Sequence, residues 1–473
     1  MPGGKRNPLS MSHMLEKVVD TMQHAKESAH ARKESLEKRM GELGLSTTYV
    51  DLQIQFIGAS GLPKMDIGGT ADPYFVANLD DKITFVSTLK SGTLAPVWNE
   101  TWKVKNVPNN ADLVIKVMDK DEGRITDDFI GTVKTTVSPG TKECEIQGPL
   151  YKGARGTFWV KIESTSSVDE DPSKFPFLFD GPIRYTRHFS PTVGALTNLN
   201  DARLYSTWKM YLRGVPLFFG DIHQPWNRNY PAAQKIFSGP ASIAVRSGIQ
   251  AGHRMLYART SSNGFGVIED KSGILQLLHG GSGPPVNNST IPPSEFAHRV
   301  KPAVYTYIIS SDDDSFRFSE TGAAFFVDFA SKHALHSNCA ERVRYSGEFH
   351  PRPKGGWDNF SDSTPDDAVD WELVIDNNSG TYAPDKGMLP ALKSLLEYNF
   401  SGFGVFAMDH GDEELKKSRE ACREYGLKYR GINKRHLQPH AKEGEETLSK
   451  RVEGSVHGTL HNSLAEAEQI RYD

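Results

Sequence analysis

The chain has 473 residues and a formal net charge of −4, with 37% hydrophobic and 24% charged residues. This length allows two or three domains, and the composition is ordinary for a soluble globular protein. The charge gives no reason to expect nucleic acid as a partner. No stretch reaches the roughly 18 apolar residues of a transmembrane helix, and the N-terminus lacks the apolar core of a signal peptide. Three widely spaced cysteines, Cys144, Cys339 and Cys422, favour a reducing, cytoplasmic compartment over a disulfide framework.

Residues 1–47 are predicted to form an N-terminal helical segment. Apolar residues between positions 11 and 43 recur near the 3.6-residue spacing of a helix, whereas residues 1–10 show no such pattern. The middle of the segment is polar on all sides, with several charge pairs at i,i+4 spacing, and is too broken for a coiled coil. We expect a short helix that docks on a following domain, with dimerisation as the alternative.

Two clusters of aspartates come next in the chain. Asp66 and Asp72 lie in GLPKMDIGGTADPYF, and Asp119, Asp121 and Asp128 lie in VMDKDEGRITDDFIG. The clusters are bounded by segments of strand-like composition, at residues 49–57, 74–78, 113–118 and 129–133. Carboxylates so close together repel one another unless a cation lies among them, and Ca²⁺ takes about 6–8 oxygen ligands. The two clusters therefore predict a calcium site.

This region resembles the C2 domain family. The resemblance lies in G-L-x-x-x-D-x-x-G-x-x-D-P-Y, then P-x-W-N-E, then D-x-D followed by D-D-F-I-G. It covers about residues 49–162, and we place the domain at residues 48–165. It implies an eight-stranded antiparallel β-sandwich whose loops at one end bind Ca²⁺ and then lipid headgroups.

The resemblance also implies which residues bind the metal. The family's ligand positions fall on Asp66, Asp72, Asp119, Asp121 and Asp128. The third loop is one residue longer than is usual in the family, so Asp127 is an alternative to Asp128. Aspartate also favours turns, and a single one would indicate little. Five together favour calcium as the cofactor.

Apolar residues lie beside both clusters, with Met65 and Ile67 next to the first and Ile125 within the second. On exposed loops such residues insert into a bilayer interface, which contributes about 0.8 kcal/mol per buried CH₂. Acidic loops are repelled by anionic lipid until bound Ca²⁺ reverses their charge. The sequence thus predicts membrane-contacting loops that bind anionic phospholipid when calcium is present.

A linker and a second domain follow. Residues 166–174 are polar and acidic and contain a proline, as linkers do, and residues 175–436 are long enough for a separate core. Residues 437–473 are predicted to be a mobile tail. The second domain is similar, in general terms, to uncharacterised regions fused to C2 domains in fungal proteins. That similarity implies no function.

The second domain is predicted to be mixed α/β. Strand-like segments are residues 207–214, 304–310, 316–322, 323–330, 341–349, 371–376 and 404–409. Helices are expected at residues 388–398 and 413–425. The last part therefore reads β-loop-α-β-α, for which a parallel pair of strands with a right-handed crossover is the default.

A speculative ligand site lies at the ends of these last two strands. In open α/β sheets, ligands collect at the carboxyl ends of the strands, where this chain has Asp376, Asn378 and Asp409. Turn chemistry alone also selects Asp and Asn at such positions. Both readings remain open at this stage.

Other catalytic patterns are incomplete. The Asp221-Ile222-His223 sequence resembles the start of a metallophosphoesterase site but lacks the later metal ligands. His333, His336 and Cys339 recur at three-residue intervals without a fourth zinc ligand. The HGGSG at residues 279–283 has no nucleophile elbow to accompany it. We therefore name no catalytic residue and favour a protein that is not an enzyme.

The favoured function is calcium-dependent phospholipid binding by a cytoplasmic, peripheral membrane protein. Its C2 domain would bring a C-terminal interaction domain, and any protein partner of that domain, to anionic membranes. One alternative is a membrane-targeted enzyme, in which Asp221, His223, Asp376 and Asp409 would have to line one pocket. Another is a scaffold whose C2 domain binds protein and uses calcium only structurally.

Replacing Ile125 with Ser is expected to weaken binding to phosphatidylserine liposomes about tenfold, because roughly 1.5 kcal/mol of apolar burial is lost. Calcium affinity should stay unchanged, because no carboxylate is altered. Co-sedimentation and calorimetry measure the two affinities, with Val168→Ser in the linker as a control. Equal lipid binding by the Ile125 variant and the parent would show that this residue does not insert.

Overall fold

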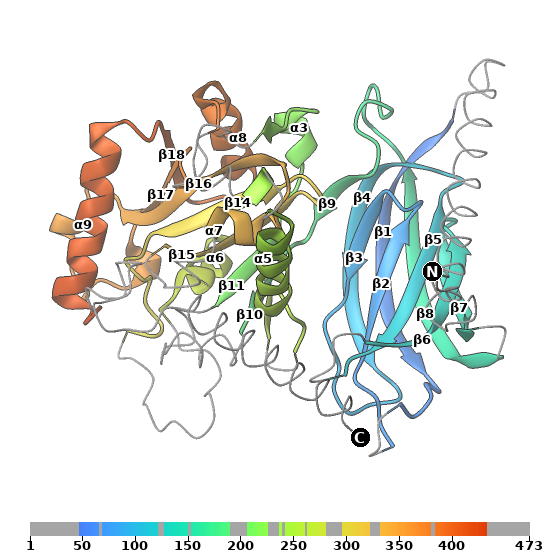
Figure 1. The fold of residues 1–473 in the computed structure, drawn as a ribbon. Coiled ribbons are helices and arrows are strands. Elements are labelled where there is room, and N and C mark those ends of the chain that lie inside the picture. The colour runs from blue at the N-terminus through green and yellow to red at the C-terminus, as the bar shows by residue number, and fades with distance from the viewer. Residues whose placement is uncertain are drawn as a thin grey trace, which may run out of the picture.

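In a computed structural model, the structure describes residues 47–65, 69–121, 127–149, 153–189, 206–225, 236–238, 242–260, 263–280, 296–321, 332–379 and 384–432. The predicted N-terminal helix and C-terminal tail lie outside these residues, as do Asp66, Ile67 and Ile125. The described residues form two units, each built on its own sheet (Figure 1).

The first unit is a β-sandwich of antiparallel strands. Its first eight strands are β1 (Tyr49–Ser60), β2 (Pro73–Leu79), β3 (Ile83–Val86), β4 (Val97–Pro108), β5 (Asp112–Asp119), β6 (Asp128–Thr136), β7 (Gly140–Gln147) and β8 (Ala154–Ser166). Their order is β3-β2-β5-β6-β7-β8-β1-β4. In the described residues β6 and β7 share one residue pair, Thr132 with Gln147, so the two halves meet only loosely there. The predicted sandwich is confirmed.

Alternation along the strands explains the core of the first unit. In β1 the buried Leu52, Ile54 and Phe56 are separated by half-buried residues, because successive side chains of a strand point to opposite faces. Phe56 contacts the rings of Phe75 and Phe85 at centroid distances of 4.6 and 5.1 Å. The buried side chains of the two halves thus share one core.

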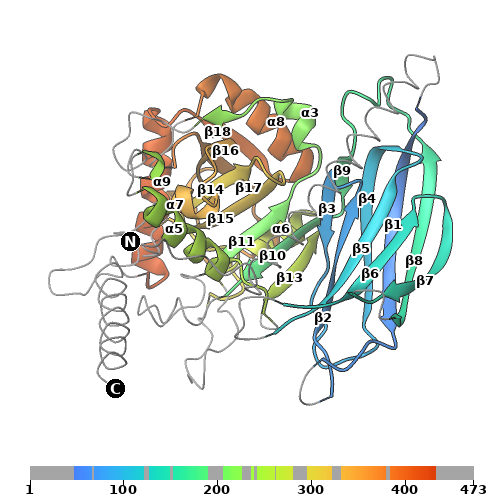
Figure 2. The ribbon, with the colours of Figure 1, turned by 45° about the vertical axis from the view of Figure 1, so that its right-hand side comes forward.

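A further strand, β9 (Leu178–Gly181), pairs with β4. The first sheet therefore continues beyond residue 174, where we expected the linker to end. Gly181 has a φ of 112°, which other residues rarely adopt, and β10 (Ile183–His188) begins two residues later. The chain thus passes directly from one sheet to the other, and β3 and β9 lie on the side of the first unit that faces the second (Figures 1 and 2).

The second unit contains a mixed sheet. Besides β10, its strands are β11 (Thr207–Tyr211), β12 (Gln224–Pro225), β13 (Gly264–Ile268), β14 (Tyr305–Ser310), β15 (Ser315–Glu320), β16 (Arg342–Pro353), β17 (Trp371–Asp376) and β18 (Gly404–Met408). The order is β13-β10-β11-β15-β14-β16-β17-β18, and β12 pairs with β16. The pairing of β17 with β18 is parallel, as predicted, and the other pairs of described strands are antiparallel.

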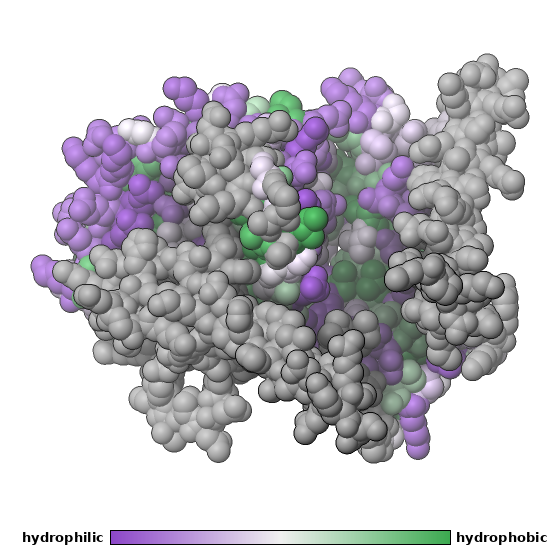
Figure 3. All heavy atoms as spheres, in the orientation of Figure 1, coloured by the Kyte–Doolittle hydropathy of each residue, from purple (hydrophilic) through white to green (hydrophobic). Residues whose placement is uncertain are grey.

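Helices cover both faces of this sheet. They are α3 (Val215–Phe219), α5 (Ser242–Leu256), α6 (Lys271–Leu278), α7 (Lys332–His336), α8 (Leu389–Asn399) and α9 (Glu413–Tyr429), with short 3₁₀ turns η2 (Trp357–Asn359), η3 (Asp366–Ala368) and η4 (Lys386–Met388). The Asp412 side chain caps α9 by accepting the Glu414 amide. Hydrophilic residues cover α9, and a small hydrophobic area lies over α5 (Figure 3). In the described part of the chain, no helix combines the length and apolarity needed to cross a bilayer.

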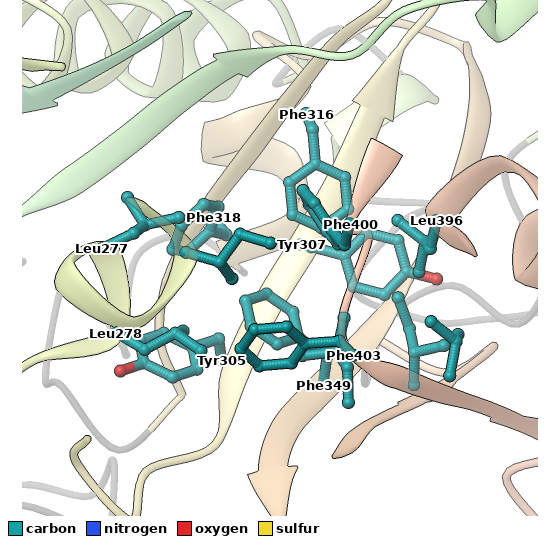
Figure 4. Close-up of a cluster of buried hydrophobic side chains, with 14 of the residues drawn as sticks. Leu277, Leu278, Tyr305, Tyr307, Phe316, Phe318, Phe349, Leu396, Phe400 and Phe403 are labelled. Carbon is teal, nitrogen blue, oxygen red and sulfur yellow. The ribbon is translucent and has the colours of Figure 1, made fainter. Parts of the chain in front are cut away.

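One face of the second sheet is aromatic and apolar (Figure 4). The Tyr305 and Phe349 rings stack at 4.9 Å between centroids, and the Tyr307 and Phe316 rings at 5.1 Å. Leucines of α6 and α8 complete this core, among them Leu277, Leu278, Leu392 and Leu396. The mixed α/β class predicted for this region is confirmed.

The opposite face carries buried polar side chains, which we call the polar layer: Thr207, Arg317, Ser319, His333 and His336. Helices α5 and α7 lie side by side over it (Figure 2). Tyr257 Oη lies 2.7 Å from His336 Nδ1, and Ser319 Oγ lies 2.9 Å from His336 Nε2. Arg317 Nη1 donates to the His336 carbonyl at 2.8 Å. These hydrogen bonds offset the cost of burying the polar groups.

Replacing Gly347 with Ala is expected to destabilise the protein by at least about 2 kcal/mol, because the added Cβ would overlap the Asp376 carbonyl of the neighbouring strand. Ser346→Ala is the matched control, since the buried Ser346 hydroxyl has no hydrogen-bond partner in the described structure. Its removal should change stability by less than about 1 kcal/mol. Urea unfolding of both variants measures the difference, and equal midpoints would contradict the predicted overlap.

Candidate functional site

Three of the predicted ligands lie at the same end of three neighbouring strands. Asp72 precedes β2, Asp119 ends β5 and Asp128 begins β6. Asp119 is opposite Pro73 on one side and opposite Asp128 on the other. Directly opposed residues of antiparallel strands bring their side chains close together. The fold therefore brings together carboxylates that are 47 and 9 positions apart in sequence, counted as 119 − 72 and 128 − 119.

Backbone donors fix two of these carboxylates. Asp119 is fully buried, and its Oδ1 accepts the Asp72 amide at 2.5 Å. Asp72 Oδ1 accepts the Gly92 amide at 2.6 Å, and the Asp72 carbonyl accepts the Lys120 amide at 3.0 Å. These bonds join the loop before β2 to the loops that follow β3 and β5. The acidic end of the first unit is thus pre-ordered by its main chain.

Asp127 has a different environment from its neighbour Asp128. Its Oδ2 accepts a hydrogen bond from the Tyr74 hydroxyl at 2.7 Å, and its Oδ1 lies 2.7 Å from Lys120 Nζ. Both oxygens are therefore held by side chains of the first unit. The carboxylate is 15% exposed, so this pair is partly shielded from solvent.

The donor atoms of the aspartates suit a hard cation. Carboxylate oxygens are the ligands that Ca²⁺ prefers, and no sulfur or imidazole ligand is required. Within the described residues, however, no three His, Cys, Asp or Glu side chains are grouped closely enough to hold a metal. Asp66 lies outside the described residues, and Asp121 lies next to residues that do. The donor chemistry fits calcium, and a closed coordination shell is not part of the described structure.

The apolar residues at this end are only partly available. Met65 is half-buried and packs against the core of the first unit, and its amide donates to the Thr70 carbonyl at 3.0 Å. Phe129, next to Asp128, is 36% exposed and was missed by the sequence analysis. Its outward direction could have been inferred, because the following Ile130 is buried and side chains alternate along a strand.

Two arginines of the second unit dock on the first unit beside this end. Arg184 of β10 forms an ion pair with Glu100 of β4 at 2.6 Å, and its guanidinium lies 4.3 Å from the Phe85 ring centroid. Arg259, which follows α5, donates to the Ser87 carbonyl at 2.6 Å, and its guanidinium lies 4.7 Å from the Tyr74 ring centroid. Burial lowers the pKa of both guanidinium groups, which Glu100 in turn raises.

In the second unit, the end of β17 holds Asp376 in a buried position. Its Oδ1 accepts the amides of Glu348 and Asn378 at 2.8 and 2.9 Å. Burial and the nearby Glu348 carboxylate raise the pKa of Asp376 to about 7, although Arg419 lies 3.6 Å away. This carboxylate thus contacts β16 and does not point to the end of β18.

Asp409 is instead joined to Asn377, which the sequence analysis did not single out. Asn377 Nδ2 donates to Asp409 Oδ1 at 3.1 Å, and the His410 amide donates to Asn377 Oδ1 at 2.9 Å. The parallel strands thus bring Asp376 and Asp409 to one edge of the sheet but give them different partners. Asn378 contacts Asp376 only through its backbone amide among the printed bonds of that carboxylate.

The remaining motifs do not converge on that edge. His223 Nδ1 lies 2.9 Å from Ser311 Oγ, and Asp221 is exposed. In the described part of the chain, neither residue forms a hydrogen bond or ion pair with Asp376 or Asp409. His333 lies 3.1 Å from Ser379, whereas burial raises the pKa of the Cys339 thiol to about 11. All three cysteines are free thiols.

Comparisons with known proteins place the first unit. The family model described as C2 domain matches residues 50–159. Synaptotagmin 1 of Drosophila melanogaster is 35% identical over 132 residues, which is 25% of this chain and 28% of that protein. Elicitor-responsive protein 3 of Oryza sativa subsp. japonica is 30% identical over 125 residues, which is 25% of this chain and 86% of that protein.

Among solved structures, a single C2 domain of plant extended synaptotagmin 1 is similar to the same part of the molecule. The match has a TM-score of 0.23 and 21% identity, and covers 26% of this chain and all of that domain. The sandwich and the sequence matches together define a C2-domain protein. The chain belongs to the C2 domain family through residues 50–159, which confirms the resemblance seen in its motifs.

The raised pKa of Asp376 predicts a pH dependence of stability. Its folded pKa of about 7 exceeds the unfolded value of 3.8, so the native state binds this proton more tightly. The contribution of Asp376 to stability is therefore full below pH 4 and is lost as pH rises to 7.

Asp376→Asn should remove this loss while its Oδ1 keeps accepting the two amides, so the variant gains stability over the parent as pH rises from 4 to 7. Urea unfolding at several pH values measures this gain. Asp370→Asn is the control, because that carboxylate is 76% exposed. A constant difference between the Asp376 variant and the parent would contradict the assigned protonation.

Proposed function

We propose that this protein binds Ca²⁺ at the acidic end of its C2 domain and then binds anionic phospholipid membranes, to which it brings the second unit. The observation that carries the proposal is the meeting of Asp72, Asp119 and Asp128 at neighbouring strand ends of a C2 domain. C2 domains are a family in which membrane binding and calcium binding are common. The role of the second unit as a binding domain for a protein partner is part of the same proposal.

The proposed calcium ligands are Asp66, Asp72, Asp119, Asp121 and Asp128. The hydrogen bond from Tyr74 and the ion pair with Lys120 support Asp128 over Asp127 as the fifth ligand, because both Asp127 oxygens already have partners. Transfer of Asp127 to the metal would require these two interactions to break. Each is a charge-assisted contact of the kind that stabilises by about 1.5–3 kcal/mol.

Charge supplies the switch. Before Ca²⁺ binds, the aspartates repel the phosphates of an anionic membrane, and each bound ion adds two positive charges to the same loops. Ile67, Ile125 and the exposed Phe129 would then enter the headgroup region, while the half-buried Met65 contributes less area. Membrane binding is therefore proposed to be reversible and peripheral.

A catalytic function has no specific observation in its favour. It required Asp221, His223, Asp376 and Asp409 to converge, and their hydrogen bonds in the described structure lead to different groups. We therefore propose a binding role for the second unit.

Replacing Asp119 and Asp121 together with Asn is expected to lower calcium affinity at least a hundredfold and to abolish calcium-dependent binding to phosphatidylserine liposomes. The fold should persist, because the side-chain oxygen that Asp119→Asn retains can still accept the Asp72 amide. Calorimetry with Ca²⁺ and co-sedimentation with and without EGTA measure the two losses.

The double variant Glu143→Gln/Glu145→Gln is a matched control, since it removes two carboxylates from β7 of the same domain. It should bind calcium and liposomes like the parent. Calcium affinity that survives in the Asp119/Asp121 variant would remove the assigned site, whereas lipid binding without calcium would support a protein that is not switched by this metal.

A further inference from the structure

A continuous set of contacts connects the acidic end of the C2 domain to the second unit. It runs from Asp127 to the Tyr74 hydroxyl, and from the Tyr74 ring to Arg259. We propose that Arg259 is a positioning residue for the calcium-binding loop between β5 and β6, which it orders through Tyr74. This inference rests on the calcium site proposed above and names how that site is regulated.

Tyr74 is placed to connect two parts of the site. It follows Asp72 and Pro73 in β2, and it is only 7% exposed. Its hydroxyl reaches Asp127, the residue before Asp128 at the end of the loop from β5. One buried side chain therefore contacts the strand that follows the first aspartate cluster and the loop that carries the second.

Arg259 holds the Tyr74 ring from the other side. Its Nη1 donates to the Ser87 carbonyl at 2.6 Å, and Ser87 in turn exchanges backbone and side-chain hydrogen bonds with Phe75, the neighbour of Tyr74. The guanidinium is thereby fixed over the ring at 4.7 Å. A cation in this position attracts the ring by about 0.5–2 kcal/mol, the larger value applying when water is excluded.

The same contact strengthens the hydrogen bond to Asp127. A positive charge on the face of a phenol withdraws electron density and makes its hydroxyl a better donor. Burial and Asp127 raise the pKa of Tyr74 far above its usual value, and Arg259 opposes them. The hydroxyl thus stays protonated and donates to the carboxylate, which Lys120 holds at its other oxygen.

This arrangement affects calcium affinity through order. A loop whose end is already fixed loses less conformational entropy when it closes on an ion, so its affinity is higher. Because Arg259 belongs to the second unit, the calcium affinity of the C2 domain depends on how that unit is docked. By linkage, bound calcium stabilises the docked arrangement by the same factor.

A purely electrostatic role for Arg259 predicts the opposite sign. A cation near a calcium site repels the ion, so removing the guanidinium would then strengthen binding. A positioning role predicts weaker binding. The direction of the change in affinity therefore separates the two roles.

The test is calcium calorimetry on the full chain carrying Arg259→Gln, Tyr74→Phe or both. Each single change is expected to weaken Ca²⁺ binding three- to tenfold. The double variant should be no weaker than either single variant, because both changes interrupt the same connection. Arg213→Gln is the matched control: that guanidinium lies 4.9 Å from the Tyr398 ring and donates to the Tyr398 carbonyl, with no contact to the C2 loops among its printed bonds. It should bind calcium like the parent.

Hydrogen exchange of residues 118–129 without calcium is the second readout. Exchange there should be faster in Arg259→Gln and Tyr74→Phe than in the parent and in Arg213→Gln. Unchanged or tighter calcium binding in Arg259→Gln, or losses that multiply in the double variant, would overturn the inference while the proposed function stands. A parent protein that binds no Ca²⁺ would overturn the proposed function, and the exchange rates would then decide alone whether Arg259 orders the loop.

Discussion

The main-chain pairing of β9 with β4 is the constraint on which the relation between the two units depends. Only four residues form β9, yet β10 begins two residues after it ends, so the second sheet starts where the first sheet stops. This short path brings Arg184 of β10 to Glu100 of β4, and a pair so shielded from water is costly to break from either side. The contacts of Arg259 with Ser87 and Tyr74 lie farther along the same surface. A C2 domain that is often a separable module is here one half of a joint structure.

The C2 domain could be predicted from sequence because its signals are local: aspartates at family spacing, a proline, and strands with alternating apolar residues. The strands β14, β16 and β17 and the parallel partner β18 were also predictable, since each is a clear apolar run. Strand β9 was not, because LFDG is too short to show alternation and follows a polar stretch. Arg184 and Arg259 were missed for a different reason: an isolated arginine usually indicates a solvated surface, and only the docked unit reveals that these two are buried. Asp376 and Asp409 were rightly assigned to one sheet edge, but sequence spacing does not show which way a terminal side chain turns.

Opposing titrations in the second unit shape its stability. Burial lowers the pKa of His188, His333 and His350 to about 3 and that of His253 to about 4, so each is neutral in the native state at pH 7. Their contribution is present above the usual histidine pKa of 6.5 and is lost as pH falls through lower values. Asp376 acts in the reverse direction over pH 4–7. The polar layer and the end of β17 therefore favour the native state under different conditions, and the most stable pH lies between their ranges.

The cover that β9 gives to β4 also has a meaning for the chain as a piece of material. Residues 48–174 look like a complete domain in sequence, but a fragment cut there would leave part of a twelve-residue strand with open amides and carbonyls. Such an edge readily recruits another strand, from a second copy or from any extended peptide. The natural unit of folding and of inheritance is thus longer than the family boundary suggests, and it ends only after Gly181 has turned the chain away.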